Sequence, residues 1–85
     1  LTSIPDSPLK ATGLLRLGDV LRVVGDLDES RLVLKQSLEV ASSLGANQEK
    51  TEALLSLANT ARAQGNSQAT LDFYQQAAAV SVPPS

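Results

Sequence analysis

Three acidic residues, Asp26, Asp28 and Glu29, lie close together in the stretch GDLDES. Carboxylate oxygens bind Ca²⁺, but such a site needs about six to eight oxygens on a constrained loop that contains a glycine. These acids instead lie where a helix is expected to begin, and acidic side chains stabilise the positive N-terminal end of a helix. The run therefore predicts helix capping rather than a metal site.

Two further acids, Asp19 and Glu52, could act as a general acid and base if two helices brought them together. Exposed acids are more often solvated or paired with a neighbouring Arg. Ser42 and Ser43 lack a base, because the chain contains no His, and no Cys is present either. We therefore predict no catalytic residues, no metal site and no cofactor, and we do not expect an enzyme.

Glycines at regular distances divide the chain into four predicted helices without a strand. The predicted N-terminal caps are Ser7 before Pro8, Asp26 or Asp28, Asn47, and Asn66 or Ser67. The predicted stops are Gly25, Gly45, Gly65 and the pair Pro83–Pro84. Because the turns between the helices are short, neighbouring helices must run antiparallel.

Each predicted helix carries apolar residues at helical spacing, which predicts a buried face. The residues expected to face the core are Leu14, Leu17, Val20, Leu21 and Val24 in the first helix, and Leu27, Leu34, Leu38 and Ala41, with Leu32 and Val33 beside them, in the second. Those expected in the third and fourth helices are Leu54, Leu57, Ala58, Ala61 and Ala63, and Leu71, Tyr74, Ala77, Ala78 and Val80.

The two halves of the chain repeat each other at a distance of 40 residues. The small residue Gly18 corresponds to Ala58, and the stop Gly25 corresponds to Gly65. A fixed period of this size is typical of a solenoid, in which stacked repeats share a core. A small side chain at 18 and 58 would let two helices approach closely.

These residues resemble the tetratricopeptide repeat family, over about residues 11–84. The positions that carry the resemblance are Leu14, Leu17, Gly18, Leu21, Ser30, Leu34 and Ser37, and again Leu54, Leu57, Ala58, Ala61, Thr70, Tyr74 and Ala77. The family's Trp and most of its aromatic residues are absent, and the period exceeds the family's usual value of about 34. This longer period resembles that of tetratricopeptide arrays in bacterial signalling scaffolds and upstream of caspase-like peptidase domains.

The expected fold is all-α: a right-handed solenoid of helical hairpins, in which four antiparallel helices form two repeats. We expect residues 1–7 to be a linker or the end of a preceding repeat, 8–46 and 47–82 to be the two repeats, and 83–85 to be a tail. Two repeats bury little surface, since a stable solenoid needs about three. The last helix is therefore expected to be covered by a further repeat or by a second copy of the chain.

The resemblance implies that the first helix of each repeat lines a concave groove for an extended peptide or a partner helix. The expected groove residues are Thr12, Leu15, Arg16, Asp19, Arg22, Val23, Glu52, Leu55, Ser56, Asn59, Arg62 and Ala63. Arg22 and Arg62 occupy equivalent positions and are expected to form a positive column that could bind a carboxylate or a carbonyl. The alternative is that both arginines pair locally, for example with Asp19 or Asp26.

The resemblance predicts no clamp for a C-terminal carboxylate, because Lys and Asn would be needed where Leu15, Asp19 and Leu55 stand, and only Asn59 matches. The predicted function is a scaffold module that binds a protein or peptide. The alternative is a structural spacer or self-association segment of a longer array, without a ligand of its own.

The composition excludes several other partners. The net charge is −2, so neither nucleic acid nor a membrane surface is an expected partner. No stretch approaches the roughly 20 apolar residues of a membrane span, and the first residues do not resemble a signal peptide. The chain contains no Met, and we expect a processed piece or fragment of a longer protein. The cytoplasm is the expected location.

Overall fold

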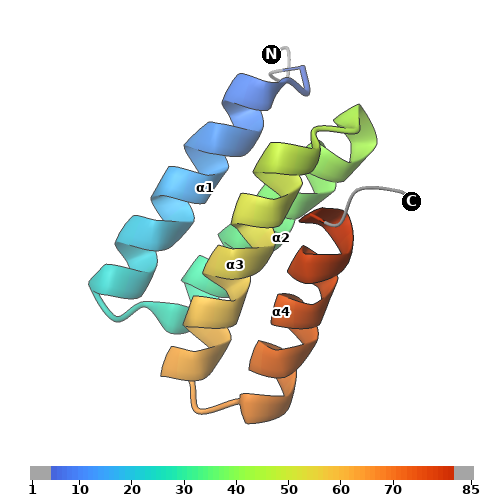
Figure 1. The fold of residues 1–85 in the computed structure, drawn as a ribbon. Helices are drawn as coiled ribbons and strands as arrows, with labels where there is room; N and C mark the ends of the chain where they lie inside the picture. Colours follow the sequence, from blue (N-terminus) through green and yellow to red (C-terminus); the bar gives the residue numbers. More distant parts are fainter. Residues whose placement is uncertain (1–4, 82–85) are drawn as a thin grey trace.

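The computed structural model describes residues 5–81 and contains four helices in that range. They are α1 (Pro8–Val23), α2 (Leu27–Leu44), α3 (Asn47–Ala63) and α4 (Ser67–Ser81). They pack as sequential antiparallel pairs, so the predicted all-α class is confirmed (Figure 1). Residues 1–4 of the expected linker 1–7 lie outside the described residues, and so does the whole of the expected tail 83–85.

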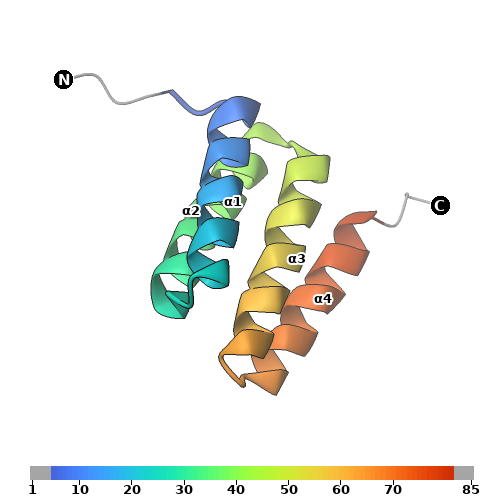
Figure 2. The ribbon, with the colours of Figure 1, turned by 90° about the vertical axis from the view of Figure 1, so that its left-hand side faces the viewer.

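The four helices form a thin slab in which α1 and α4 lie at opposite ends (Figures 1 and 2). The Cα positions extend over 40 × 37 × 14 Å. Within each hairpin α1 packs on α2 and α3 packs on α4, and α3 also contacts both α1 and α2. The third helix therefore joins the two hairpins, whereas the first and last helices each have one side without a neighbouring helix.

Three turns of the same construction connect the helices. Gly25 has a φ of +90°, and Asp26 N donates to Leu21 O over 2.8 Å, which satisfies a carbonyl at the end of α1. The turns at Gly45 and Gly65 repeat this geometry, with φ of +65° and +77°. Side chains other than glycine rarely adopt such angles, so the three predicted helix stops are confirmed for a physical reason.

The predicted N-terminal caps are confirmed in part. The Ser7 hydroxyl accepts from Lys10 N over 3.2 Å, and Asn66 Oδ1 accepts from Ala69 N over 3.0 Å. Asp26 occupies the cap position of α2 without a side-chain hydrogen bond. The cap predicted at Asn47 is wrong, because the turn after Gly45 places Ala46 at the cap and Asn47 is already helical.

Small residues and serines bring α1 and α2 close together. Ser30 and Ser37 of α2 are buried, and their hydroxyls donate over 2.7 Å to the backbone oxygens of Gly18 and Ala11. The two serines are seven residues apart, as are their two acceptors, so the contact recurs after two helical turns. Glycine at position 18 permits this approach, because a Cβ there would collide with the Leu34 side chain and force it to move.

Ser30 also connects the first hairpin to the second. Its oxygen lies 3.1 Å from the Thr60 hydroxyl of α3, and both residues are fully buried. Since the single Ser30 proton goes to the Gly18 carbonyl, Thr60 must be the donor to Ser30. The result is a buried chain of hydrogen bonds from α3 through α2 to α1.

The polar residues Asp28, Arg31 and Gln64 form a second connection between the hairpins. Gln64 Nε2 donates to Asp28 Oδ1 over 2.9 Å, and Arg31 Nη1 donates to Gln64 Oε1 over 3.4 Å. The Arg31 guanidinium also lies 5.7 Å from the centre of the Phe73 ring, within the range of a cation–π contact. Residues of α2 thus contact both helices of the second hairpin.

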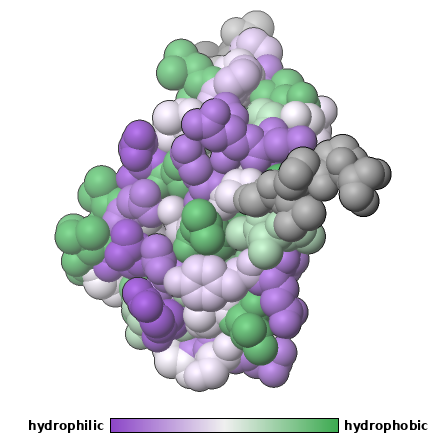
Figure 3. Space-filling model, viewed as in Figure 1, coloured by the Kyte–Doolittle hydropathy of each residue, from purple (hydrophilic) through white to green (hydrophobic). Residues whose placement is uncertain are grey.

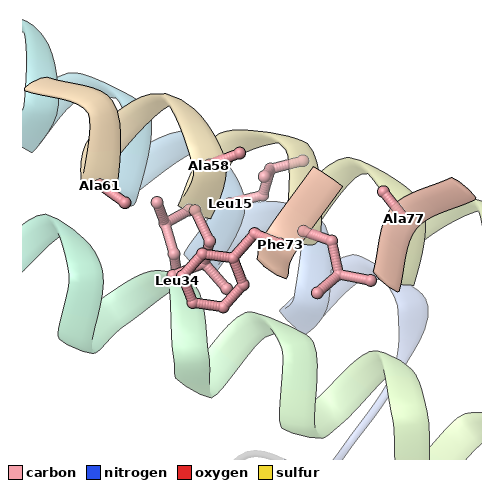
Figure 4. Packing of buried hydrophobic residues seen from close by; sticks show 8 residues of the cluster. Leu15, Leu34, Ala58, Ala61, Phe73 and Ala77 are labelled. Carbon is pink, nitrogen blue, oxygen red and sulfur yellow. The ribbon is translucent and has the colours of Figure 1, made fainter. Parts of the chain in front are cut away.

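The main core lies where the two hairpins meet. Leu34 of α2 and Phe73 of α4 lie near its centre, with small side chains of α3 beside them (Figure 4). The buried members of this cluster are Leu15, Leu34, Leu54, Leu57, Ala58, Ala61, Phe73 and Ala77. A smaller cluster of Ala11, Val40 and Ala41 fills the space between α1 and the end of α2. The core therefore depends on the seam between the repeats.

Several residues expected in the core are exposed instead. They are Leu17 and Val20 in α1, Val24 directly after α1, Leu32 in α2, Ala63 in α3, and Leu71, Tyr74 and Ala78 in α4. In α1, Ala11 and Gly18 face α2, because close packing requires small side chains there, and Leu15 between them is buried in the main core. In α4, Phe73 is buried, whereas Tyr74 lies on the side with no following helix.

The Gly18→Ala variant should be less stable than the wild type by about 1 kcal/mol. Overpacking against Leu34 costs about 1–3 kcal/mol, and the gain in helix propensity offsets about 0.5–1 kcal/mol of it. Gly13→Ala is the matched control, because a Cβ there meets nothing within 4 Å. Urea denaturation should show that Gly13→Ala stabilises the protein, and stabilisation by both variants would contradict the close contact.

The Ser30→Ala variant should lose more stability than Ser37→Ala. Ser37→Ala removes one buried hydrogen bond, worth about 0.5–1.5 kcal/mol, whereas Ser30→Ala also leaves the buried Thr60 hydroxyl without its acceptor, at about 1–3 kcal/mol. Thermal and urea unfolding of the two variants measure the difference. Equal losses would argue against the link from Ser30 to Thr60.

Candidate protein-binding face

The twelve groove residues predicted from the sequence lie on two helices, six on α1 and six on α3. These two helices contact each other directly. We call the surface that these twelve residues form the α1/α3 face. It therefore contains residues from both repeats.

A shallow hollow of about 280 Å³ lies between α1 and α3. Its lining residues are Leu15, Arg16, Asp19, Glu52, Leu55 and Ser56, all of them among the twelve predicted. Leu15 and Leu55 are equivalent positions 40 residues apart, and they supply the apolar part of the lining. Half of the predicted set is thus brought together around one depression.

Two of the lining residues belong to the core rather than to the exposed surface. Leu15 is only 3% exposed and is a member of the main hydrophobic cluster, and Ser56 is buried as well. Leu15 therefore lines the hollow but offers little surface to a partner, because its side chain packs in the core. Its equivalent Leu55 is 40% exposed and offers apolar surface to a partner.

Arg22 and Asp19 pair with each other within α1. Arg22 Nη2 lies 3.8 Å from Asp19 Oδ1, and both side chains are about 30% exposed. Asp19 Oδ1 and Arg22 Nε have no hydrogen-bond partner within the described part of the chain. Arg22 is thus engaged locally, and the predicted column of Arg22 and Arg62 stays a prediction.

Three other charges on the α1/α3 face are available to a partner. Arg16 and Arg62 are exposed and Glu52 is half-buried. Within residues 5–81 none of the three takes part in an ion pair. The face therefore offers charges of both signs, with Arg16 and Glu52 around the same hollow.

The remaining residues of the face extend it past the hollow in both directions. Thr12 is half-buried, whereas Val23 and Ala63 are exposed near the ends of their helices. Asn59 accepts a hydrogen bond from the Tyr74 hydroxyl over 3.3 Å. Tyr74 of α4 thus contacts the face, a neighbour that sequence reasoning missed because it expected this side chain in the core.

Of the acids considered for chemistry from the sequence, Asp19 and Glu52 both line the hollow between α1 and α3, and Asp19 pairs with Arg22. Asp26 and Asp28 lie at the start of α2, and Asp28 accepts a hydrogen bond from Gln64. No group of three or more potential metal ligands is found in the described residues. Among the described helices none is long and apolar enough to span a membrane.

Comparison with protein families agrees with this geometry. A sequence profile described as tetratricopeptide repeat matches residues 9–81, which is most of the chain. The chain belongs to the tetratricopeptide repeat family. Neither the comparison with curated proteins nor the comparison with solved structures gave a match.

Membership of the tetratricopeptide repeat family sets the general role of the module. Such modules generally mediate protein–protein interactions and are typically non-catalytic. The two pairs of antiparallel helices fit two such repeats. No specific partner follows from the family alone.

Truncation should separate the core from the exposed part of the α1/α3 face. Leu15→Ala should cost about 2–5 kcal/mol, because it opens a cavity in the core. Leu55→Ala, the same change at the equivalent position of the second repeat, should cost less than about 1 kcal/mol, because that side chain is already partly in water. Urea denaturation of both variants checks this order, and a larger loss for Leu55→Ala would contradict the burial of Leu15.

Proposed function

We propose that the chain is a scaffold module that binds an extended peptide or a partner helix on the α1/α3 face. The observation that carries the proposal is the hollow to which both repeats contribute, with Leu55 exposed and unpaired charges around it. A surface that combines an apolar centre with charged groups at its margin is typical of protein recognition sites.

The charges of the face indicate what kind of peptide would fit. Arg16 lies on one side of the hollow and Glu52 on the other, while Asp19 is already compensated by Arg22. We propose a partner that places an apolar side chain against Leu55, with a basic residue near Glu52 and an acidic residue near Arg16. A free C-terminal carboxylate is a poor ligand, because the uncompensated Glu52 would repel it.

We also propose how the chain divides. Residues 8–46 and 47–82 form the two repeats, because α1 with α2 and α3 with α4 are the two hairpins. The period of 40 supports an assignment to the long-repeat arrays of the family, the type that the sequence resembles in bacterial scaffolds.

A selection from a library of displayed random peptides tests the proposal. Selected peptides should shift the backbone amide signals of α1 and α3 in two-dimensional ¹H–¹⁵N NMR spectra, and not those of the exposed side of α2. Leu55→Glu and Arg16→Glu should each weaken binding of the selected peptides at least about tenfold, because the first inserts a charge into the apolar centre and the second reverses the charge that would face the partner's acidic residue.

Two exposed residues of α2 provide matched controls. Leu32→Glu and Lys35→Glu make the same changes on a surface away from the α1/α3 face and should leave binding unchanged. Peptides whose shifts map to α2, or whose affinity falls equally in the control variants, would contradict the proposal. Circular dichroism of each variant establishes that the fold is intact.

A further inference from the structure

The two end helices of the slab expose apolar surface. On α1, Leu17 is 49% exposed and Val20 is 59% exposed, and on α4, Leu71 is 52% exposed and Tyr74 is 38% exposed. A hollow of about 460 Å³ along α1 is lined mainly by Leu9, Gly13, Leu14 and Leu17. Apolar patches are visible at the outer edge of the molecule on the α1 side (Figure 3). On α4 these apolar side chains lie among exposed polar ones, such as Asp72, Gln75 and Gln76. Exposed apolar side chains at an end of a solenoid are the kind that a neighbouring repeat covers.

The repeat relationship shows what each exposed side resembles. The equivalents of Leu17 and Val20 in α3 are Leu57 and Thr60, and both are fully buried where α3 meets α2. The equivalent of Tyr74 in α2 is Leu34, which is fully buried in the same seam. The exposed side of α1 thus matches one half of an existing interface, and the exposed side of α4 matches the other half.

We propose that a second copy of this chain packs its α1 on α4 of the first, head to tail, and repeats the α2–α3 seam between molecules. In this arrangement Tyr74 lies beside Leu17 and Leu21 of the next copy, as Leu34 lies with Leu57 and Ala61 within the chain. The proposed contact touches the α1/α3 face only at Tyr74, which donates to Asn59, and it does not depend on the proposed peptide binding.

The hydrogen-bonding groups at the projected seam are already satisfied. Within the chain, the seam needs the bond between Ser30 and Thr60, and their equivalents are Thr70 and Val20. Val20 has no hydroxyl, and the Thr70 hydroxyl donates to Asn66 O of its own helix over 2.8 Å. Val20 can therefore cover Thr70 without leaving a buried donor unpaired.

The polar contact between Asp28 and Gln64 across the internal seam also has no polar equivalent in the projected seam. Asp28 and Gln64, which bond across the internal seam, correspond to Gln68 and Val24. Gln68 donates to Asp72 within α4 over 3.1 Å, and Val24 is apolar and exposed. Arg31 corresponds to the exposed Leu71. The projected seam is thus more apolar than the internal one, as an interface between separate molecules requires.

This contact joins two different surfaces, so it generates chains or rings rather than a symmetric dimer. Sedimentation equilibrium of the 85-residue chain should show a mass that rises with concentration beyond that of a dimer. Two double variants test the geometry. Leu17→Glu with Val20→Glu blocks the α1 end, and Leu71→Glu with Tyr74→Glu blocks the α4 end. Each alone should weaken self-association at least about 100-fold, because charges would be buried in an apolar seam.

A mixture of the two blocked variants gives the decisive result. Each retains one intact end, so the mixture should form a one-to-one heterodimer and stop there. Leu32→Glu, an equally exposed leucine on α2, is the control and should associate like the wild type. Circular dichroism should show all variants to be helical, because every substituted side chain is at least partly exposed.

Three outcomes would overturn the proposal. The wild type could stay monomeric at high concentration, which would mean that the exposed sides of α1 and α4 bind other repeats or other partners rather than a second copy. One blocked variant could still form dimers, which would indicate a symmetric contact through α1 alone or α4 alone. The mixture could also fail to form the heterodimer although the wild type associates, which would place the contact elsewhere.

Discussion

The fold depends on the close approach of three helices at one buried point. Gly18 of α1 lets the Leu34 side chain lie against its backbone, and Ser30 of α2 donates to the Gly18 carbonyl while it accepts from Thr60 of α3. A larger residue at 18 would push α1 away, and an apolar residue at 30 would leave Thr60 unpaired in the core. The chain thus combines a steric requirement with a hydrogen-bonding one at the contact that joins its two hairpins.

This contact has consequences for the face proposed to bind partners. Because α1 and α3 are held through α2, Leu15 is drawn into the core and Leu55 is left on the surface, although the two residues are equivalent in the repeat. The hollow between the helices therefore has a packed floor and an exposed rim. A rigid floor lowers the entropic cost of binding, because the receptor needs little ordering when the partner docks.

The sequence predicts the repeat and its turns well, because these depend on local chemistry. A left-handed backbone at Gly25, Gly45 and Gly65 needs glycine, and the period of 40 relates two of these turns. Burial at Leu17 and Tyr74 could not be predicted in the same way. Their equivalents Leu57 and Leu34 are buried, and the difference lies in the neighbouring helix, which is present inside the seam and absent at the ends. The burial of Phe73 was missed for a different reason, because helical spacing fits Phe73 and Tyr74 almost equally well as the residue that faces the core.

A double-mutant cycle between Ser30 and Thr60 tests the central claim most directly. Ser30→Ala, Thr60→Val and the double variant are compared by urea denaturation, followed by circular dichroism. If the two hydroxyls bond across the seam, the stability losses of the two single variants should add up to at least about 0.5 kcal/mol more than the loss of the double variant. The unfolding of each variant should remain a single transition. Additive losses, or two separate transitions for the two hairpins, would contradict a fold that is held together at this point.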